Sequence, residues 1–598
     1  MVSYRVRLAD LRQHHFEVDC RIDAATKEEY FSLPSWIPGS YLLREYARHV
    51  VSARAESQRR EVAITKVDKS TWKVQGAQGE LTVTIRVHAL DLSVRGAYLD
   101  TQRGYFNGTC LFLSVRGRAD ESIEVELESP ADPLAASWRV ATAMLPAQVD
   151  ARGFGRYVAA DYAELIDHPV EVGHFARIDF TVAGIPHALV IAGKHETDHE
   201  RIATDLRQLC EAQQAFFGAP APFDRYLFLG LAVDKGYGGL EHRASSSLIF
   251  SANDLPRPVE PGAPAEYQRF LSLCSHEYFH AWHIKQLKPA AFSPPRLNER
   301  NYTRLLWVFE GITTYYQDRL LLCSDLIGRD AYLSRLAQTL TKVYRTPGRF
   351  QQSVAESSFE AWDKLYKPEP NSANATISYY SKGALVALAL DLTLRAATDS
   401  AVSLDRLIVE LWNRYGRQGT GLGETDFEEF AERIAGFELK EFFDTAIRDT
   451  VDLPLGDLLD KFGVTFELRP ATGPQDQGGA INQRSGESLV SLGVTQKEGP
   501  QGLELVNVQA GGPAEAAGMS AGDQIIALGG YRIDAQNLAR RLERFDPGDS
   551  VTVAFFRRNE LFEAELTVAS APLDTCSLTV QDEADPAKRR LRTHWLGN

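Results

Sequence analysis

Residues 275–286 read SHEYFHAWHIKQ and hold three histidines and one glutamate in twelve positions. His276 and His280 are four residues apart, so a helix places both imidazoles on one face. Zinc is commonly held by two histidines at this spacing, and Glu277 between them would act as the general base on the zinc-bound water. A chance match to so short a pattern is the competing interpretation. The third histidine, His283, is expected to be an ordinary helix residue.

A catalytic zinc needs a third protein ligand, and the position of that ligand separates the families. The pattern H-E-x-x-H-x-x-G-x-x-H fails, because His283 stands at its glycine position and Gln286 at its last histidine position. The other solution is a glutamate on a following helix. The stretch RLLWVFEGITTYYQDRLLL predicts such a helix and places Glu310 among apolar side chains. A buried carboxylate is costly unless it is paired or binds a metal, so Glu310 is the expected ligand and Thr314 a candidate hydrogen-bond partner.

Two further segments suit the hydrolysis of a peptide bond. In GYGGLEHRASS, between two apparent strands, Gly238 and Gly239 would let a substrate backbone approach closely, and Glu241 would supply a charge. The competing interpretation is a turn at a strand edge. The stretch YYSKGALVALALDL begins a helix with a tyrosine pair. A phenol of this pair, if it lies near the metal, would stabilise the oxyanion of a tetrahedral intermediate, whereas the competing interpretation is simple packing.

These motifs together carry a family resemblance. The H-E-x-x-H pattern with Glu310 in the sequence FEG resembles the gluzincin metallopeptidases, the class of thermolysin and aminopeptidase N. GGLEH resembles the aminopeptidase motif Gly-x-Met-Glu-Asn, which implies that Glu241 binds the free α-amine of the substrate. His242 replaces the asparagine of that motif. Tyr380-Ser-Lys-Gly matches the motif Tyr-x-Lys-Gly, which implies that Tyr380 stabilises the transition state.

The closer resemblance is to the glycyl aminopeptidase family, because the gap before Glu310 is longer than in aminopeptidase N. The stretches LPSWIPGSYLLREYARHV (33–50), RGYFNGTCLF (103–112) and HEYFHAWHIKQLKP (276–289) resemble that family, as does the order of the domains. The resemblance covers nearly the whole chain. It implies a zinc aminopeptidase, with one zinc ion per chain, that removes N-terminal glycine or alanine from peptides with a free N-terminus.

The C-terminal part has a signature of its own. SLGV resembles the carboxylate-binding Gly-Leu-Gly-Phe loop of PDZ domains, and GGPAEAAGMSAGDQIIALGG (511–530) resembles the PDZ core. The expected carboxylate loop is therefore Leu492, Gly493 and Val494. A peptide C-terminus would add as a strand between this loop and a helix predicted at 535–545. The alternative is a PDZ domain that only packs on the catalytic domain.

Periodicity predicts a multi-domain α+β protein. Apolar residues alternate in LTVTIRVHAL and SIEVELES, which is typical of a largely antiparallel, sandwich-like β-domain. HALVIAG and RYLFLGLAVD suggest buried strands, and long segments with helical spacing follow them, the first expected at 265–288. The expected divisions are an N-terminal β-domain (1–170), a thermolysin-like catalytic domain with a mixed sheet lobe and a helical lobe (171–455), a polar linker (456–487), a PDZ domain (488–570) and a charged, loosely ordered tail (571–598).

Composition narrows the class of partner. The formal net charge is −15 and the isoelectric point about 5.5, which argues against a nucleic-acid partner and suits a cationic ligand such as a peptide amino terminus. The six cysteines are scattered without a C-x-x-C pair, as expected of free thiols in a reducing compartment. The sequence suggests neither a signal peptide nor a membrane span, so the cytoplasm is the expected location.

Two other functions stay open at this stage. The first is a zinc endopeptidase with PDZ-assisted substrate binding, in which Glu241 lines an ordinary subsite. The second is a peptide-binding PDZ adaptor whose peptidase domain is inactive. The complete set of expected ligands, together with Glu277, argues against the adaptor.

Overall fold

The computed structural model describes every residue except 259–261, 474, 481–489, 501 and 598. The chain divides into two compact units. The first unit comprises Met1–Asn301 and Leu411–Leu422, and the second comprises Tyr302–Glu410 and Gly423–Asn598. Each unit is described separately below.

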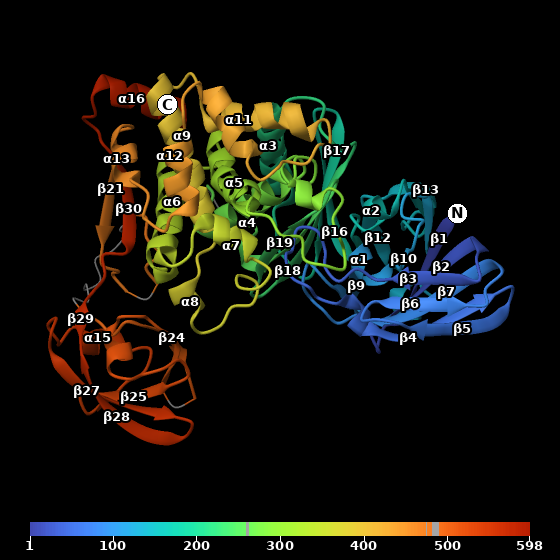
Figure 1. Ribbon diagram of the computed structural model, residues 1–598, viewed down its shortest axis with the longest axis horizontal. Helices are drawn as coiled ribbons and strands as arrows, with labels where there is room; N and C mark the ends of the chain where they lie inside the picture. Colours follow the sequence, from blue (N-terminus) through green and yellow to red (C-terminus); the bar gives the residue numbers. More distant parts are fainter. Residues whose placement is uncertain (259–261, 474, 481–489, 501, 598) are drawn as a thin grey trace. The chain divides into compact units, whose positions relative to one another are not determined.

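The N-terminal part of the first unit is a β-domain, drawn in blue in Figure 1. Its eleven-stranded sheet has the order β10-β3-β6-β5-β4-β7-β2-β1-β11-β14-β13, and a second sheet has the order β12-β15-β9-β8. Besides the four strands treated below, these are β3 (Glu28–Ser32), β4 (Val50–Ser57), β5 (Arg60–Lys66), β6 (Thr71–Gln75), β8 (Ala97–Leu99), β9 (Arg103–Phe106), β10 (Ser114–Val115), β12 (Arg139–Thr142), β13 (Leu145–Val149), β14 (Gly155–Ala159) and β15 (Val170–Gly173). Phe16 and Val18 of the large sheet share one hydrophobic core with Phe106 and Val172 of the small one. The prediction of a largely antiparallel N-terminal β-domain is confirmed.

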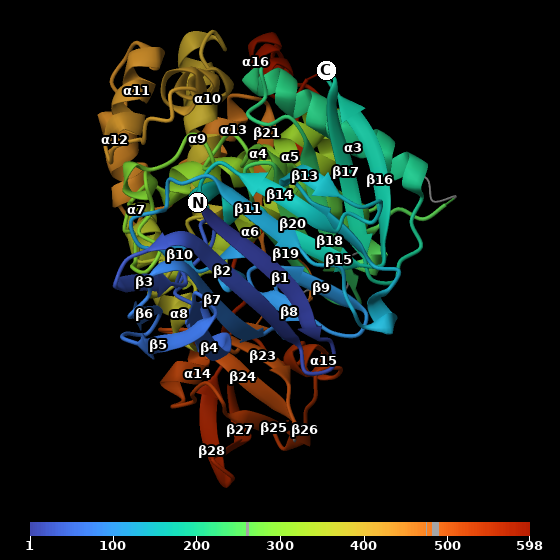
Figure 2. The same ribbon diagram turned by 90° about the vertical axis from the view of Figure 1, so that its right-hand side faces the viewer.

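The predicted strands lie at the centre of the large sheet, where Figure 2 shows β1, β2 and β7 next to one another. LTVTIRVHAL falls on β7 (Gly79–His88), and SIEVELES falls on β11 (Ile123–Leu127). β2 (His15–Ala25) pairs antiparallel with both β7 and β1 (Val2–Asp10), whereas β1 and β11 run parallel. Alternate side chains point inward because successive residues of a strand face opposite sides of the sheet.

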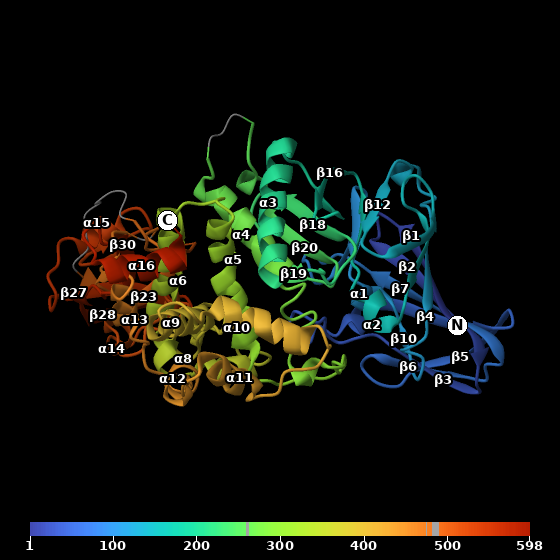
Figure 3. The same ribbon diagram turned by 90° about the horizontal axis from the view of Figure 1, so that it is seen from above.

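The mixed sheet that was predicted next also lies in the first unit. Its order is β16-β17-β18-β20-β19, with β17, β18 and β20 parallel and both edge strands antiparallel. α3 (His199–Phe217) packs along this sheet, as Figure 3 shows, and α4 (Ala265–Phe279) lies against β19 and β20. The strands span Phe175–Val182 (β16), Ile185–Ala192 (β17), Tyr226–Val233 (β18), Tyr237–Glu241 (β19) and Ser245–Ser251 (β20).

The helix that carries the two histidines is shorter than predicted. It ends at Phe279 with His280 as its C-cap, not near Pro289. Ile284 has a φ of 103°, and its backbone N–H donates to the carbonyl of Leu287, so the chain turns back on itself after the histidines. A left-handed residue cannot continue an α-helix, which is why the apolar periodicity beyond His280 overstated the length.

The second unit contains the predicted helical lobe. The segment of Glu310 is a π-helix (η5, Trp307–Gly311) that continues into α5 (Ile312–Cys323). α6 (Arg329–Tyr344) and α9 (Ser381–Thr398) pack against α5. Single π-helical turns inside helices occur frequently at functional sites.

The PDZ domain of the second unit has a hydrophobic core of its own, formed by residues between Val490 and Val568. Its sheet has the order β23-β24-β25-β27-β28, visible in red and orange in Figure 1. Its elements include β22 (Val490–Ser491), β23 (Val494–Glu498), β24 (Leu503–Val508), β25 (Gln524–Leu528), α15 (Leu538–Leu542), β27 (Ser550–Arg557), β28 (Glu560–Thr567) and β29 (Ala569–Ser570).

The segments on either side of the PDZ domain are more ordered than predicted. β21 (Val464–Arg469) lies in the expected linker, yet it pairs antiparallel with β30 (Thr575–Val580) from the expected loose tail. α16 (Pro586–Leu596) buries Trp595 completely. The prediction of a loosely ordered tail is wrong, because local charge hid the alternation of TCSLTV and the apolar end of α16. Residues 474 and 481–487 of the expected linker, and the first two residues of the expected PDZ domain, 488 and 489, lie outside the described residues.

Candidate metal centre and peptide site

The two histidines of the H-E-x-x-H pattern lie side by side at the end of α4. Their Nε2 atoms are 3.0 Å apart, and the rings are almost perpendicular, at 87°. Nδ1 of His280 lies 2.8 Å from the carbonyl oxygen of His283. A carbonyl can only accept, so Nδ1 carries the proton and Nε2 keeps its lone pair, as a metal ligand must. His283 thus acts through its backbone, and its imidazole is not part of the ligand group.

Glu310 completes a set of metal-binding atoms. One side-chain atom from each of His276, His280 and Glu310 lies within 4.8 Å of the other two. His280 and Glu310 are buried, at 1% and 2% exposure. Two imidazole nitrogens and a carboxylate oxygen are zinc donors, and two nitrogens that share a tetrahedral zinc ion are separated by roughly 3.4 Å. The residues therefore fit a zinc ion.

The Glu277 carboxylate lies against the edge strand β19. A Cβ atom placed on Gly239 would come within 2.0 Å of Oε1 of Glu277, so only glycine leaves room for this side chain. Glu277 is 4% exposed. Nη2 of Arg95, from the N-terminal β-domain, donates to the carbonyl of Gly239 at 3.1 Å and holds the strand from outside. Gly238, the neighbouring predicted residue, has no contact as close, so its α-carbon stays accessible.

Glu241 ends β19 and is 4% exposed. The next residue, His242, is equally buried and donates from Nδ1 to Asp167 at 3.1 Å, while Nζ of Lys285 donates to the same oxygen at 2.8 Å. Burial lowers the pKa of His242. Burial by itself would raise the pKa of Asp167, but Lys285 and His242 hold it well below its usual range. Asp167 thus fastens the end of β19 to the loop that follows the metal helix.

Tyr380 precedes α9 and belongs to a cluster of three phenols. The hydroxyl of Tyr366 lies 2.9 Å from that of Tyr380 and 3.2 Å from that of Tyr379. Tyr379 is fully buried, whereas Tyr380 is partly exposed. Of the pair, Tyr380 is therefore the one that is accessible to solvent.

A contact between two glycines sets the Glu310 segment against the Tyr380 segment. A Cβ atom on Gly311 would lie 2.7 Å from the α-carbon of Gly383 and 3.0 Å from the carbonyl oxygen of Tyr379. The glycines of FEG and SKG thus let the two backbones touch. The role of Thr314 as a hydrogen-bond partner of Glu310 stays a prediction.

The loop formed by Leu492, Gly493 and Val494 makes a tight turn that requires glycine at its centre. Gly493 has a φ of 69°, and a Cβ atom there would come within 2.9 Å of Pro513. Leu492 and Val494 line a cavity of about 410 Å³ together with Leu538 and Leu542 of α15. This cavity coincides with the groove predicted between the loop and the helix.

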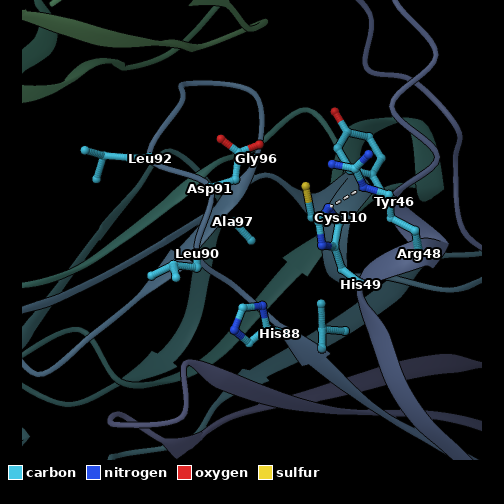
Figure 4. A pocket seen from close by; sticks show the side chains of 11 residues that line it. Tyr46, Arg48, His49, His88, Leu90, Asp91, Leu92, Gly96, Ala97 and Cys110 are labelled. Atoms are coloured by element: carbon cyan, nitrogen blue, oxygen red, sulfur yellow. Dashed lines mark hydrogen bonds between the residues drawn. The ribbon is translucent and has the colours of Figure 1, made fainter.

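The N-terminal β-domain has a separate cavity of about 480 Å³, shown in Figure 4. Arg48 donates to Nε2 of His49 at 3.1 Å, and burial lowers the pKa of His49. Cys110, in the same wall, has its thiol pKa raised by burial. Among the described residues these side chains form no metal-binding group, and the cavity suggests no catalytic chemistry.

Sequence reasoning missed three residues of this neighbourhood: Asp167, Arg95 and Tyr366. Arg95 contacts Gly239 from 144 residues away, and Asp167 contacts His242 from 75 residues away, whereas Tyr366 contacts Tyr380 from 14 residues away. No sequence motif pointed to any of the three. Within the described ranges, none of the helices is both long and apolar enough for a membrane crossing.

Three parts of the chain match known protein domains. Residues 3–174 match the model of the peptidase M61 N-terminal domain, residues 269–386 that of the M61 glycyl aminopeptidase, and residues 490–568 that of the PDZ domain. A crystal structure of an aminopeptidase N family protein from Idiomarina loihiensis is 40% identical, with a TM-score of 0.95, and the match covers 99% of both chains.

Two other similarities are weaker. An M1 zinc metallopeptidase from Deinococcus radiodurans is 14% identical over 76% of this chain and 94% of its own, with a TM-score of 0.47. A "Probable periplasmic serine endoprotease DegP-like" of Brucella suis is 34% identical over 85 residues, which are 14% of this chain and 16% of that protein. The chain thus spans only a small part of this curated relative. The full-length match and the family models show that the chain belongs to the M61 glycyl aminopeptidase family of zinc metallopeptidases and carries a PDZ domain.

Proposed function

We propose that this zinc aminopeptidase removes small N-terminal residues, glycine or alanine, from peptides with a free amino terminus. The observation that carries the proposal is the course of β19, where Gly239 touches the Glu277 carboxylate and Glu241 lies two residues farther on. Residues two apart in a strand share a face and are about 6.6–6.8 Å apart. One extended residue is about 3.5 Å long. The spacing therefore leaves room for the first residue of a substrate, with its α-ammonium group at Glu241 and its scissile bond at Glu277. The match to the M61 glycyl aminopeptidase model supports the proposed preference for glycine, and the family resemblance of the sequence motifs is the basis for including alanine.

The proposed zinc ligands are His276, His280 and Glu310, with one ion per chain. Zinc supplies a Lewis acid that polarises the scissile carbonyl and lowers the pKa of water. The buried Glu277 accepts the proton of the attacking water at its carboxylate and passes it to the leaving amine. The partly exposed phenol of Tyr380 donates a hydrogen bond to the oxygen on which negative charge develops.

The substrate is held along β19. The backbone of Gly238 and Gly239, at the edge of the sheet, pairs with the substrate backbone as an added strand would. The Glu241 carboxylate pairs with the α-ammonium group. Since a peptide bond has no such charge at this point, the pair distinguishes the first residue of a chain from an internal one.

The PDZ groove and the compartment complete the proposal. The groove beside Leu492, Gly493 and Val494 is proposed to bind the C-terminus of a peptide, because apolar side chains line it. We place the protein in the cytoplasm, since all six cysteines are free thiols and five of them are buried. Free thiols persist in reducing compartments.

The decisive experiment compares alanyl and N-acetyl-alanyl p-nitroanilides, each with and without 1,10-phenanthroline. The expected result is cleavage of the free-amine substrate only, and its loss with the chelator. Efficient cleavage of the acetylated substrate would favour an endopeptidase, in which Glu241 lines an ordinary subsite. Undiminished activity with the chelator, after metal removal has been verified by elemental analysis, would contradict a zinc mechanism.

A further inference from the structure

A loop of the N-terminal β-domain reaches the end of β19. The loop comprises residues 33–45 and is held by the segment that follows the metal helix. Nε1 of Trp36 donates to the backbone carbonyl of Arg296 at 2.9 Å. The backbone N–H of Ser35 donates to the backbone carbonyl of Leu297 at 2.8 Å. The ring of Tyr41 stacks on Phe292, with the centroids 5.7 Å apart. These contacts hold the loop in place beside β19.

Gly39, in this loop, lies against the Glu241 carboxylate. A Cβ atom placed on Gly39 would lie 2.3 Å from Oε1 and 2.5 Å from Oε2 of Glu241. The carboxylate thus occupies the space that any other residue would fill with its side chain. Gly39 also has a φ of 99°, in the left-handed region that favours glycine.

We propose that Gly39 is a positioning residue for the amine anchor, and that the loop of residues 33–45 sets the depth of the subsite for the substrate's α-amine. This inference rests on the proposed role of Glu241. The Gly39 α-carbon is the stop against which the carboxylate rests, so it fixes the distance between the carboxylate and the scissile bond. The N-terminal β-domain thereby takes part in defining where a substrate begins.

The expected effect of Gly39→Ala on catalysis follows from the distance between the added Cβ atom and the Glu241 carboxylate. An alanine at this position would have to push the carboxylate away by about 1 Å to reach an ordinary van der Waals distance. Misplacement by about 1 Å can lower catalysis by roughly 10²-fold. Because the anchor binds the ammonium group in the ground state as well, the loss should appear mainly in KM for free-amine substrates.

The test pairs Gly39→Ala with the control Gly76→Ala. Gly76 lies in the same β-domain, has a similar φ of 81° and would have no atom within 4 Å of an added Cβ. The control therefore carries the backbone strain without the collision. On alanyl p-nitroanilide, Gly39→Ala should raise KM at least about 10-fold with an unchanged zinc content and circular dichroism spectrum, whereas Gly76→Ala should leave KM unchanged.

A compensating variant separates positioning from misfolding. Glu241→Asp shortens the side chain by one methylene group, which relieves the collision. Alone it should raise KM, but in the Gly39→Ala background it should restore part of the lost activity. Equal effects of Glu241→Asp in both backgrounds, or a wild-type KM for Gly39→Ala, would overturn the inference.

A third variant distinguishes this inference from the proposed function. If Glu241→Gln abolishes the preference for free-amine substrates while Gly39→Ala leaves KM unchanged, only the inference is overturned. If Glu241→Gln leaves that preference intact, the amine anchor is wrong, and the inference is overturned together with it.

Discussion

The PDZ domain is inserted between β21 and β30, which pair with each other. We therefore predict that excising the domain leaves a stable protein, whereas truncating the chain before it does not. The backbone N–H of Gly479 donates to the carbonyl of Cys576 at 2.9 Å, so the chain enters and leaves the module at neighbouring points. Excision would replace residues 481–573 by a short Gly-Ser linker. Truncation would instead end the chain before Ser488 and also remove β30 and α16.

Truncation should be far more damaging than excision. Trp595 of α16 is 1% exposed, and its Nε1 donates to the Tyr315 hydroxyl at 3.1 Å. Loss of such a tryptophan costs about 3–5 kcal/mol, and loss of a hydrogen bond about 1 kcal/mol. The β21–β30 ladder is lost as well. Together these losses approach the ~5–15 kcal/mol by which a typical protein is stable.

Excision removes much less. Among the described residues, hydrogen bonds between the PDZ domain and the helical lobe join Asn374 to Val508 and Ala510, at 2.8 and 3.1 Å, and Asn507 to Pro370, at 2.8 Å. At about 1 kcal/mol each, they are a small loss. The excised protein should keep its zinc and its activity on alanyl p-nitroanilide, while longer peptides lose affinity.

Thermal unfolding compares the stability of the excised and truncated proteins, and elemental analysis gives their zinc content. Assays on a small and a long substrate measure the activity of the excised protein. A truncated protein as stable as the excised one would refute the insertion argument. Equal loss of activity on both substrates by the excised protein, with the zinc retained, would mean that the PDZ domain shapes the active site.

Four further predictions concern single residues. His280→Ala should lower the zinc content from one ion per chain, measured by elemental analysis; an unchanged stoichiometry would remove this residue from the ligand set. Glu277→Gln should keep zinc and fold but lose at least about 10²-fold in kcat, because an amide cannot accept the proton; near-normal turnover contradicts its role. Tyr380→Phe should lower kcat far more than it changes KM, and a larger effect of Tyr379→Phe would shift the assignment by one residue. The pKa of Asp167 is depressed in the folded protein, so its contribution to stability is present above the unfolded pKa of about 3.9 and is lost as the pH falls below it. Asp167→Asn should therefore destabilise the protein by about 3–5 kcal/mol at pH 7, and less in acid; a difference in the denaturation midpoint that does not shrink with falling pH would contradict this.

Those parts of the proposed site that depend on local geometry could be predicted from the order of the residues alone. The spacing of His276 and His280 already places both rings on one helix face, and a lone carboxylate among apolar residues already singled out Glu310. The PDZ signature likewise follows from glycines that local turns require, such as Gly493 with its positive φ. Such features need only the neighbouring chain, so a pattern reveals them.

The distant residues that hold these groups in place could be identified only from the folded chain. Asp167 meets His242 and Gly39 meets Glu241 because the β-domain and the mixed sheet bring together residues far apart in sequence. β30 finds its partner only after the whole PDZ domain has intervened. These contacts depend on which strands become neighbours, and no local periodicity encodes that, because alternation specifies the faces of a strand but not the strand beside it.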